Sequence, residues 1–182
     1  QIRCKNNKKS QKVEIGSTLF DVFSAFNLKM THGPVSARVN NKVEGMHYRV
    51  YNAKDVEFLD MTSASGSRAY TRTLFFVLCK AVQDIYPNTD VVIDIPVSNG
   101  FYVDIHLGRP VVDEDVNILR RRMQEIIDDK MPIRRYMVPT EEAIALFEEK
   151  GDVEKVKLLK TSGSIYTTYY KIGEYVDFYY GT

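Results

Sequence analysis

Residue types that build disulfides and metal centres are scarce in this chain. Its 182 residues include two cysteines, Cys4 and Cys79, and three histidines. The cysteines form no C-x-x-C pair, and the histidines have no H-E-x-x-H or similar ligand spacing. Two cysteines are too few for a disulfide framework or a four-cysteine zinc site, so we expect both to be reduced. We expect no metal site.

Long apolar runs and an N-terminal leader are also missing. No stretch of 18 or more apolar residues occurs, and the first residues do not have the pattern of a signal peptide. With 44% hydrophobic and 27% charged residues, the composition is that of an ordinary globular protein. We therefore expect a soluble, cytoplasmic protein that is not associated with a membrane.

A phosphate-binding loop is absent as well. The P-loop requires a glycine followed by a lysine, and no Gly-Lys dipeptide occurs in the chain. Ser65-Gly66-Ser67-Arg68 precedes a helical pattern, but it does not follow a strand as a dinucleotide-binding loop does. We interpret the small, polar segment 62–67 as a linker between two domains.

The charges support a division at this linker. Residues 1–61 hold 10 basic and 6 acidic side chains, a net charge of +4, whereas residues 62–182 hold 15 and 18, a net charge of −3. The two parts are therefore expected to differ in their partners.

Residues 1–61 have the pattern of a small sheet with one covering helix. Leu19, Phe20, Phe23 and Phe26 recur at helical spacing. Asn40-Asn41 predicts a turn between strands. Strand-like segments lie at residues 1–5, 11–15, 35–39, 48–51 and 56–61. This order predicts an α+β fold of the β-grasp, or ubiquitin-like, type.

Residues 62–182 predict a larger α+β domain. An apolar helical stripe runs from Leu74 to Ile85, and alternating segments on either side of residues 98–100 predict a hairpin. Three acids at 113–115 open a helix that ends near Lys130. The remaining pattern comprises a strand at 133–138, short helices at 140–147 and 151–160, and strands at 165–172 and 175–180.

Most reactive or charged groups in this second part have an ordinary structural interpretation. The acids at 113–115 are expected to be solvated. Arg120-Arg121-Arg122 is expected to point to water, with Arg121 or Arg122 paired to Glu125. Cys79 lies in the apolar stripe, where a thiol stays neutral and inert.

Two features are compatible with catalysis or binding. His106 and Asp104 share a strand face, as an acid and base pair does, although a surface histidine has the same pattern. Tyrosine rings near the end of the chain are able to stack on bases, but Lys171 is the only cation among them, so strand packing is the favoured interpretation. They are the tyrosines at positions 166, 169, 170, 175, 179 and 180.

Several short motifs resemble threonyl-tRNA synthetase. They are Ile85-Tyr86-Pro87, the segment 98–104 (SNGFYVD), Asp113-Glu114-Asp115-Val116, Glu154-Lys155-Val156 and Glu174-Tyr175-Val176-Asp177. In order and spacing they are similar to the N-terminal half of that enzyme, a TGS domain followed by an editing domain. The resemblance covers nearly the whole chain. It implies a TGS-like β-grasp domain at residues 1–61 and an editing-like α+β domain at residues 62–182, truncated at its C-terminal end.

In that family, the editing domain hydrolyses mischarged tRNA with two histidines on its first helix and a cysteine and a histidine after the tyrosine-valine-aspartate strand. The resemblance places Arg72 and Phe76 at the first two positions and Tyr179 at the cysteine position, and the last position falls beyond Thr182. It therefore implies that zinc binding and hydrolysis are absent. A degenerate pocket for an anionic or nucleotide-like ligand remains, and its candidate residues are Arg72, Phe76, Lys155, Asp177 and Tyr179.

The chain also resembles the N-terminal region of uridine kinase-like proteins, in which the same two domains precede a P-loop kinase domain. This resemblance implies a non-catalytic binding or regulatory region of a nucleoside kinase. The downstream kinase domain of the same chain would be its partner and would use ATP and Mg²⁺. No cofactor is expected for residues 1–182 themselves.

Two alternatives stay open. One is an active editing-type hydrolase that binds an aminoacyl ester and a water through Arg72, Asp177 and Tyr179. The other is an RNA-binding module that acts through the basic first domain. Its candidate RNA-binding residues, on the predicted hairpin, are Lys5, Lys8, Lys9 and Lys12.

Overall fold

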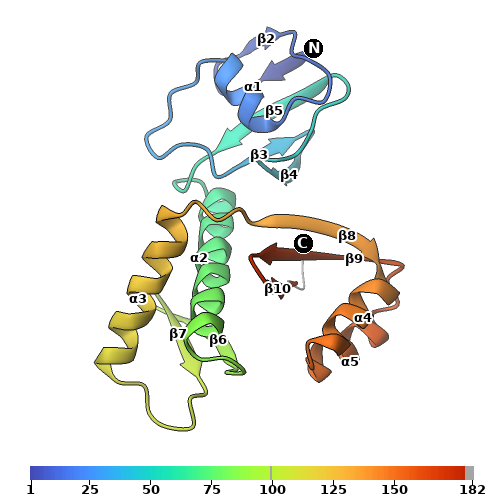
Figure 1. Ribbon diagram of the computed structural model, residues 1–182. Coiled ribbons are helices and arrows are strands. Elements are labelled where there is room, and N and C mark those ends of the chain that lie inside the picture. The colour runs from blue at the N-terminus through green and yellow to red at the C-terminus, as the bar shows by residue number, and fades with distance from the viewer. Residues whose placement is uncertain (99, 179–182) are drawn as a thin grey trace. The chain divides into compact units, whose positions relative to one another are not determined.

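The computed structural model describes residues 1–98 and 100–178, without the side chains of residues 94 and 95. The chain forms two compact units, Gln1–Phe75 and Phe76–Thr182, and one long helix, α2 (Ala64–Ile85), runs from the first into the second (Figure 1). Helices and strands occur together in both units, which confirms the α+β class. No helix in the described residues is long and apolar enough to cross a membrane. The TGS and editing-domain folds stay predictions.

The first unit is a five-stranded sheet with one short helix packed on it (Figure 1). Across the sheet the strands are β2 (Lys9–Gln11), β1 (Ile2–Cys4), β5 (Lys54–Leu59), β3 (Ser36–Val39) and β4 (Lys42–Gly45). β1 and β5 are parallel, and the other neighbours are antiparallel. The helix, α1 (Leu19–Ala25), buries Leu19 and Val22 against Val56 and Phe58 of the sheet. This contact forms the core of the first unit.

The second strand of the hairpin begins earlier than predicted. It covers Lys9–Gln11 instead of residues 11–15, and Ile15 is 78% exposed. The reason is a tight turn: Lys8 has a φ of 59°, and the Lys9 amide donates to Asn7 Oδ1 at 3.0 Å. Lys9 therefore lies opposite Cys4, and the pairing ends at Gln11.

The predicted strand at residues 48–51 was wrong. The strand that follows β3 in the chain and pairs with it is β4, which comes directly after the predicted turn, where Asn40 and Asn41 both have positive φ. Tyr48 and Val50 use their backbone groups elsewhere. The Tyr48 carbonyl accepts from the Leu19 amide at 3.0 Å, and the Val50 amide donates to the Ser17 carbonyl at 3.0 Å. The alternation therefore reflects pairing with the start of α1, not with the sheet.

The segment predicted as a linker is helical from Ala64 onward. Ser63 caps this helix, because its Oγ accepts from the Gly66 amide at 3.1 Å and donates to the Asp60 carbonyl at 3.0 Å. Gly66 packs directly against the Asp60 carbonyl. The small residues here allow the backbone of α2 to approach the Asp60 carbonyl closely. A flexible linker has the same small, polar composition, so the sequence did not distinguish the two.

The second unit surrounds the rest of α2 with two small sheets. The hairpin of β6 (Val91–Val97) and β7 (Gly100–Ile105) and helix α3 (Asp113–Asp128) pack against α2 through Val82, Leu119 and Ile126. The other sheet has the order β10-β9-β8. Its strands and the helices between them are β8 (Arg134–Pro139), α4 (Thr140–Glu149), α5 (Val153–Ser162), β9 (Tyr166–Ile172) and β10 (Tyr175–Asp177).

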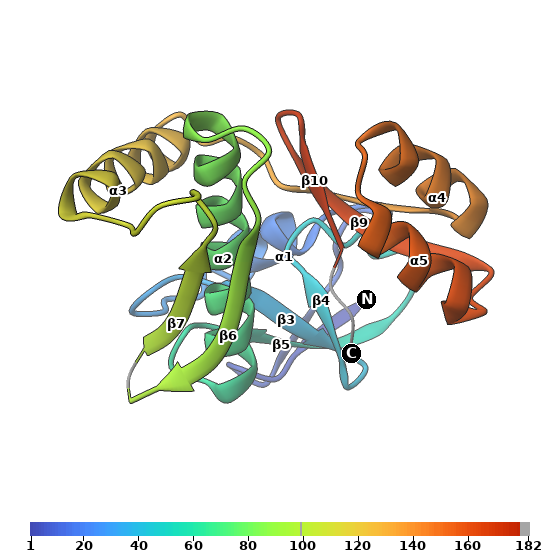
Figure 2. The same ribbon diagram turned by 90° about the horizontal axis from the view of Figure 1, so that it is seen from below.

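Both faces of the β8–β10 sheet pack against helices, but strand β8 at its edge is largely exposed. Alternate residues face α2, where Tyr170 and Ile172 join the core around Phe76. The opposite face packs Tyr169 and Val176 on α4 and α5, which lie side by side in Figure 2. The two faces therefore have different chemical surroundings.

One acid of the first turn of α3 is buried, although solvation was predicted. Asp115 is 3% exposed and accepts from the Tyr86 hydroxyl at 2.6 Å. Two nitrogens of Arg109 donate to its carboxylate at 2.6 and 2.8 Å, and the Val112 amide donates at 3.0 Å. Asp115 thus caps α3 and fixes the loop before it. The expected pairing of Arg122 with Glu125 is confirmed at 2.9 Å, and Asp84 binds the same guanidinium.

Replacing Asp115 with asparagine is expected to remove a pH-dependent part of the stability. Hydrogen bonds from Arg109, Tyr86 and the Val112 amide hold the pKa of Asp115 well below its usual range. The folded state therefore favours the ionised carboxylate, and its contribution is complete above the unfolded pKa of about 4 and is lost as pH falls below it. Urea unfolding between pH 7 and about pH 2.5 should show a difference between the wild type and D115N that shrinks on acidification.

Asp113→Asn is the matched control for this prediction, because Asp113 lies in the same helical turn and is exposed. It should leave the pH profile nearly unchanged. Equal effects of D113N and D115N would mean that the interaction is a general helix-dipole effect and not the bonds to Arg109 and Tyr86.

Candidate functional site

Lys155 and Asp177, both predicted as ligand-binding residues, are in contact. Lys155 Nζ on α5 lies 3.1 Å from Oδ1 of Asp177, the last residue of β10, and 2.8 Å from Oδ2 of Asp152, which caps α5. The Tyr175 hydroxyl donates to Asp177 Oδ2 at 2.8 Å. The ammonium also lies 5.6 Å from the centre of the Phe147 ring. We call these five residues the Lys155–Asp177 cluster.

The Lys155–Asp177 cluster has a net negative charge, because two carboxylates share one ammonium. Burial acts to lower the pKa of Lys155, but the negative charges of Asp177 and Asp152 outweigh it and raise that pKa above its ordinary value. Burial, assisted by the charge of Asp177, raises the pKa of Tyr175, so its phenol stays protonated. The side chains of Lys155 and Asp177 are 28% and 16% exposed, which leaves both within reach of a ligand.

Phe76 is a core residue. Its side chain is 2% exposed, and its ring centre lies 5.1 Å from that of Tyr175 and 6.3 Å from that of Tyr170. A phenyl ring has neither a titratable proton nor a lone pair for a metal. Nearby on α2, burial raises the pKa of the Cys79 thiol to about 11, as expected for an inert cysteine.

Two further residues, Arg72 and Tyr179, were predicted to line the same pocket. Arg72 is exposed on α2, one helical turn before Phe76, and belongs to the first unit. Tyr179 lies outside the described residues. Sequence reasoning had missed Asp152, Phe147 and Tyr175 as cluster members. Two of them had a local signal: Asp152 is three residues before Lys155, as a helix cap is, and Tyr175 alternates with Asp177 on one strand.

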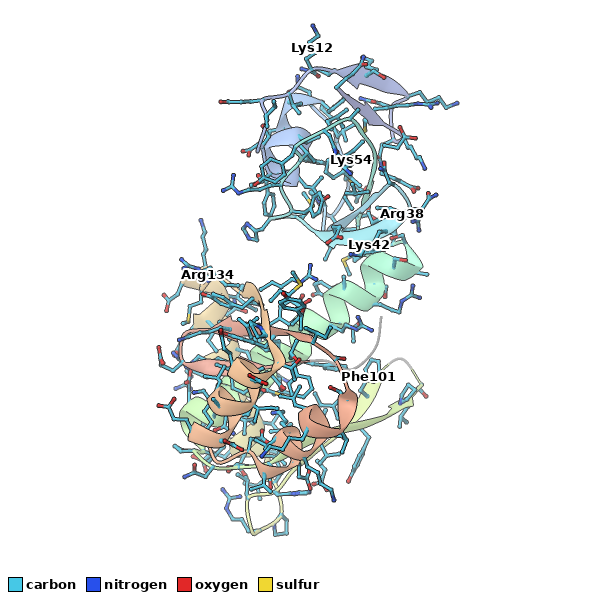
Figure 3. All side chains as sticks on the ribbon, turned by 90° about the vertical axis from the view of Figure 1, so that its right-hand side faces the viewer. Lys12, Arg38, Lys42, Lys54, Phe101 and Arg134 are labelled. Atoms are coloured by element: carbon cyan, nitrogen blue, oxygen red, sulfur yellow. The ribbon has the colours of Figure 1, made fainter. Side chains whose placement is uncertain are left out.

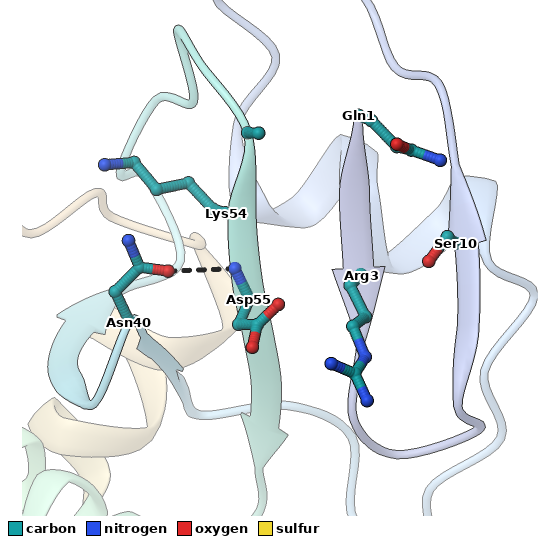
Figure 4. Close-up of a pocket in the computed structure, with 7 residues that line it drawn as sticks. Gln1, Arg3, Ser10, Asn40, Lys54 and Asp55 are labelled. Carbon is teal, nitrogen blue, oxygen red and sulfur yellow. Dashed lines mark hydrogen bonds between the residues drawn. The ribbon is translucent and has the colours of Figure 1, made fainter.

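The four lysines predicted to bind RNA are exposed on or beside the β1–β2 hairpin. Lys12, labelled in Figure 3, follows β2, and Lys5 Nζ donates to Asn41 Oδ1 at 3.4 Å. A hollow close to this hairpin is lined by Arg3, Lys54 and Asp55, and the Asp55 amide in it donates to Asn40 Oδ1 at 2.9 Å (Figure 4). The hollow contains none of the four lysines. Their role in RNA binding stays a prediction.

The acid and base pair predicted from the sequence, His106 and Asp104, lies on the surface. His106 Nε2 is 3.1 Å from Asp104 Oδ2, and both side chains are half exposed. An exposed ion pair of this kind contributes little to stability. Among the side chains that the structure describes, which leave out residues 94, 95, 99 and 179–182, no three from His, Cys, Asp or Glu gather closely enough to hold a metal ion.

Comparison with known proteins finds that the chain is similar in sequence to threonine–tRNA ligases. The chain is 29% identical over 163 residues to the enzyme of Acetivibrio thermocellus, covering 89% of this chain and 26% of the relative. It is 29% identical over 179 residues to that of Clostridium kluyveri (97% and 28%) and 27% identical over 165 residues to that of Caldanaerobacter subterraneus subsp. tengcongensis (90% and 26%).

These matches confirm the resemblance to threonyl-tRNA synthetase at the level of sequence similarity. The chain spans about a quarter of the length of the relatives it matches. No protein-family model matches it.

Proposed function

We propose that this chain is a binding module related to the N-terminal part of threonine–tRNA ligases, which holds an aminoacyl-nucleotide group at the Lys155–Asp177 cluster without hydrolysing it. In this proposal the first unit is TGS-like and the second editing-like. The observation that carries it is the buried ring of Phe76. This ring occupies the helix position at which the resemblance implies a catalytic histidine, and it is packed against Tyr170 and Tyr175.

Ester hydrolysis needs a group that takes a proton from water near neutral pH. The raised pKa values of Cys79, Tyr175 and Lys155 keep all three protonated at pH 7. Asp177 is an acceptor, but it already receives the Tyr175 hydroxyl, the Phe178 amide at 2.7 Å and the Lys155 ammonium. These contacts support a cluster that orients a ligand and does not activate water.

The charge of the cluster indicates which part of the ligand it contacts. An anionic ligand was expected from the sequence, but a net negative site favours an ammonium group over a free phosphate. An aminoacyl group has such an ammonium next to its ester. We therefore propose that Asp177 and Asp152 receive the amino group, while the ammonium of Lys155 keeps both carboxylates in place.

Two measurements on the 182-residue chain test this proposal. Seryl- or threonyl-tRNA incubated with the chain should lose its amino acid no faster than in buffer, with a threonine–tRNA ligase as the positive control. The amide analogue of seryl-adenosine, which cannot hydrolyse, should bind. D177N should weaken that binding by about tenfold or more, the usual effect of losing a hydrogen bond to a charged group.

Lys157→Gln is the control for Lys155→Gln, because both lysines are on α5 and Lys157 is exposed. K155Q should lose affinity and K157Q should keep it. Deacylation above the buffer rate that disappears in D177N would establish the hydrolase alternative instead. Absence of binding by the wild type would overturn the proposal.

The link to a nucleoside kinase is a separate part of the proposal and rests on resemblance alone. It predicts a G-x-x-x-x-G-K-[ST] motif downstream of Thr182 in the same coding sequence, where ATP and Mg²⁺ would bind. Reading the codons after residue 182 tests it. A continuation without that motif removes the kinase and leaves the binding module unaffected.

A further inference from the structure

Two cations lie directly opposite each other on the β8–β10 sheet. Arg134, the first residue of β8, is the register partner of Lys171 on β9. Opposite residues of an antiparallel pair share a face, with Cβ atoms about 5 Å apart, and like charges in this arrangement are destabilising. Arg134 is labelled in Figure 3 and is exposed. A bound anion would relieve the repulsion between the two side chains.

The next rung on the same face is a pair of tyrosines. Tyr136 is the register partner of Tyr169, and their rings are stacked with centres 5.2 Å apart and planes 19° apart. Tyr169 packs into the core beneath α4 and α5, whereas Tyr136 is 36% exposed. The Tyr136 ring is therefore accessible to a ligand, and its stacking on Tyr169 holds it in place. Successive residues on one strand face are about 7 Å apart, which sets the distance between the rings and the cations.

Among the described residues, one acid, Glu174, pairs with the cations of these two rungs. Lys171 Nζ lies 3.6 Å from Glu174, whose side chain is 92% exposed, and such pairs contribute little. A third cation, Lys150, donates to the Glu174 carbonyl at 3.1 Å. No ion pair connects Arg134 to any residue within the described part of the chain.

We propose that Arg134, Lys171 and Tyr136 bind a nucleotide unit, with the phosphate on the two cations and the base stacked on Tyr136. A guanidinium binds two phosphate oxygens at once, an ammonium adds a point charge, and aromatic rings accept any base. None of these three residues belongs to the Lys155–Asp177 cluster, and Asp177 itself pairs with Tyr170, whereas Arg134 pairs with Lys171, the next residue along β9. A free mononucleotide and single-stranded RNA both present this chemistry.

The test uses the whole 182-residue chain and a fluorescein-labelled ten-nucleotide oligouridylate, with anisotropy measured at several salt concentrations. R134Q should weaken binding by about tenfold and reduce the slope of log K against log salt by about 0.7, the value for one phosphate contact on a single strand. Y136L should weaken binding by about tenfold, whereas Y136F should stay within about twofold, because stacking needs the ring and not the hydroxyl. E174Q should tighten binding by removing the competing acid.

Two controls match these variants. Arg120→Gln makes the same charge change at an exposed position on α3, and Tyr166→Leu removes an exposed ring from the opposite face of the same strand pair. Both should leave affinity within about twofold. Circular dichroism of each variant separates loss of binding from loss of folding.

Competition with uridine monophosphate and with inorganic phosphate identifies the source of the ligand. Binding of the monophosphate itself, lost in R134Q and Y136L, would assign the site to free nucleotides, and binding of the oligonucleotide alone would assign it to RNA. Equal effects of R134Q and R120Q would overturn the proposal. So would inorganic phosphate competing as well as the monophosphate, or no binding of either nucleotide probe. K155Q should not change any of these results, so they are independent of the proposed aminoacyl site.

Discussion

Replacing Gly66 with alanine is expected to destabilise the first unit by about 2–3 kcal/mol, although alanine normally stabilises a helix by about 1 kcal/mol relative to glycine. Gly66 lies in the first turns of α2, and a Cβ atom there would lie far inside van der Waals distance of the Asp60 carbonyl. The obstacle is backbone, which cannot move aside as a flexible side chain does. The same carbonyl accepts from Ser63, so displacing it also breaks the helix cap.

Urea unfolding followed by circular dichroism measures this effect, with Ser67→Ala as the control. Ser67 is the next residue of α2 and is exposed, so S67A should change the stability by no more than about 0.5 kcal/mol. Because the chain has two units, the unfolding curve has to be fitted without assuming a single transition. A G66A protein that is more stable than the wild type would show that Asp60 and Gly66 do not touch in solution and that the segment is a linker after all.

The periodic parts of the chain were predictable from the sequence. Helix α2 over Leu74 to Ile85 and the β6–β7 hairpin lie where the apolar pattern predicted them. A long apolar stripe at helical spacing, or a regular alternation, is compatible with few other secondary structures. The predictions were wrong where a short alternating segment could form hydrogen bonds with either of two other segments. Tyr48 and Val50 alternate like a strand, but their hydrogen bonds go to the residues at the start of α1.

The polar contacts were less predictable, because they join residues that are distant in sequence. Asp115 looked like one of three equivalent acids, and only the fold brings Tyr86, 29 residues away, to its carboxylate. Arg134 and Lys171 are separated by 37 positions, so no local pattern reveals that they are strand partners. Within the candidate site, the resemblance pointed to Lys155 and Asp177. It did not indicate that Asp152 would make the cluster negatively charged.

Introducing a histidine at position 76 is expected to cost stability and not to create a hydrolase. F76H puts an imidazole among the rings of Tyr170 and Tyr175, where an unpaired polar nitrogen and lost packing together should cost about 3 kcal/mol. Burial disfavours the charged imidazolium, so the pKa of this histidine in the folded state should lie below its ordinary value of about 6.5. Protons then bind preferentially to the unfolded chain, and the stability of F76H should fall further as pH drops below about 6.5.

Phe76→Leu is the control for this prediction, because leucine loses ring contacts without adding a titratable group. F76L should be destabilised to a similar extent at pH 8, but its difference from the wild type should stay constant between about pH 8 and pH 5. Urea unfolding at these pH values measures both variants, and the seryl-tRNA assay should find neither above the buffer rate. An F76H protein that is as stable as the wild type and binds zinc or deacylates tRNA would contradict this prediction. It would show that the other residues of the site still support hydrolysis and that the Phe76 ring alone prevents it. The binding module would then be one substitution away from an enzyme.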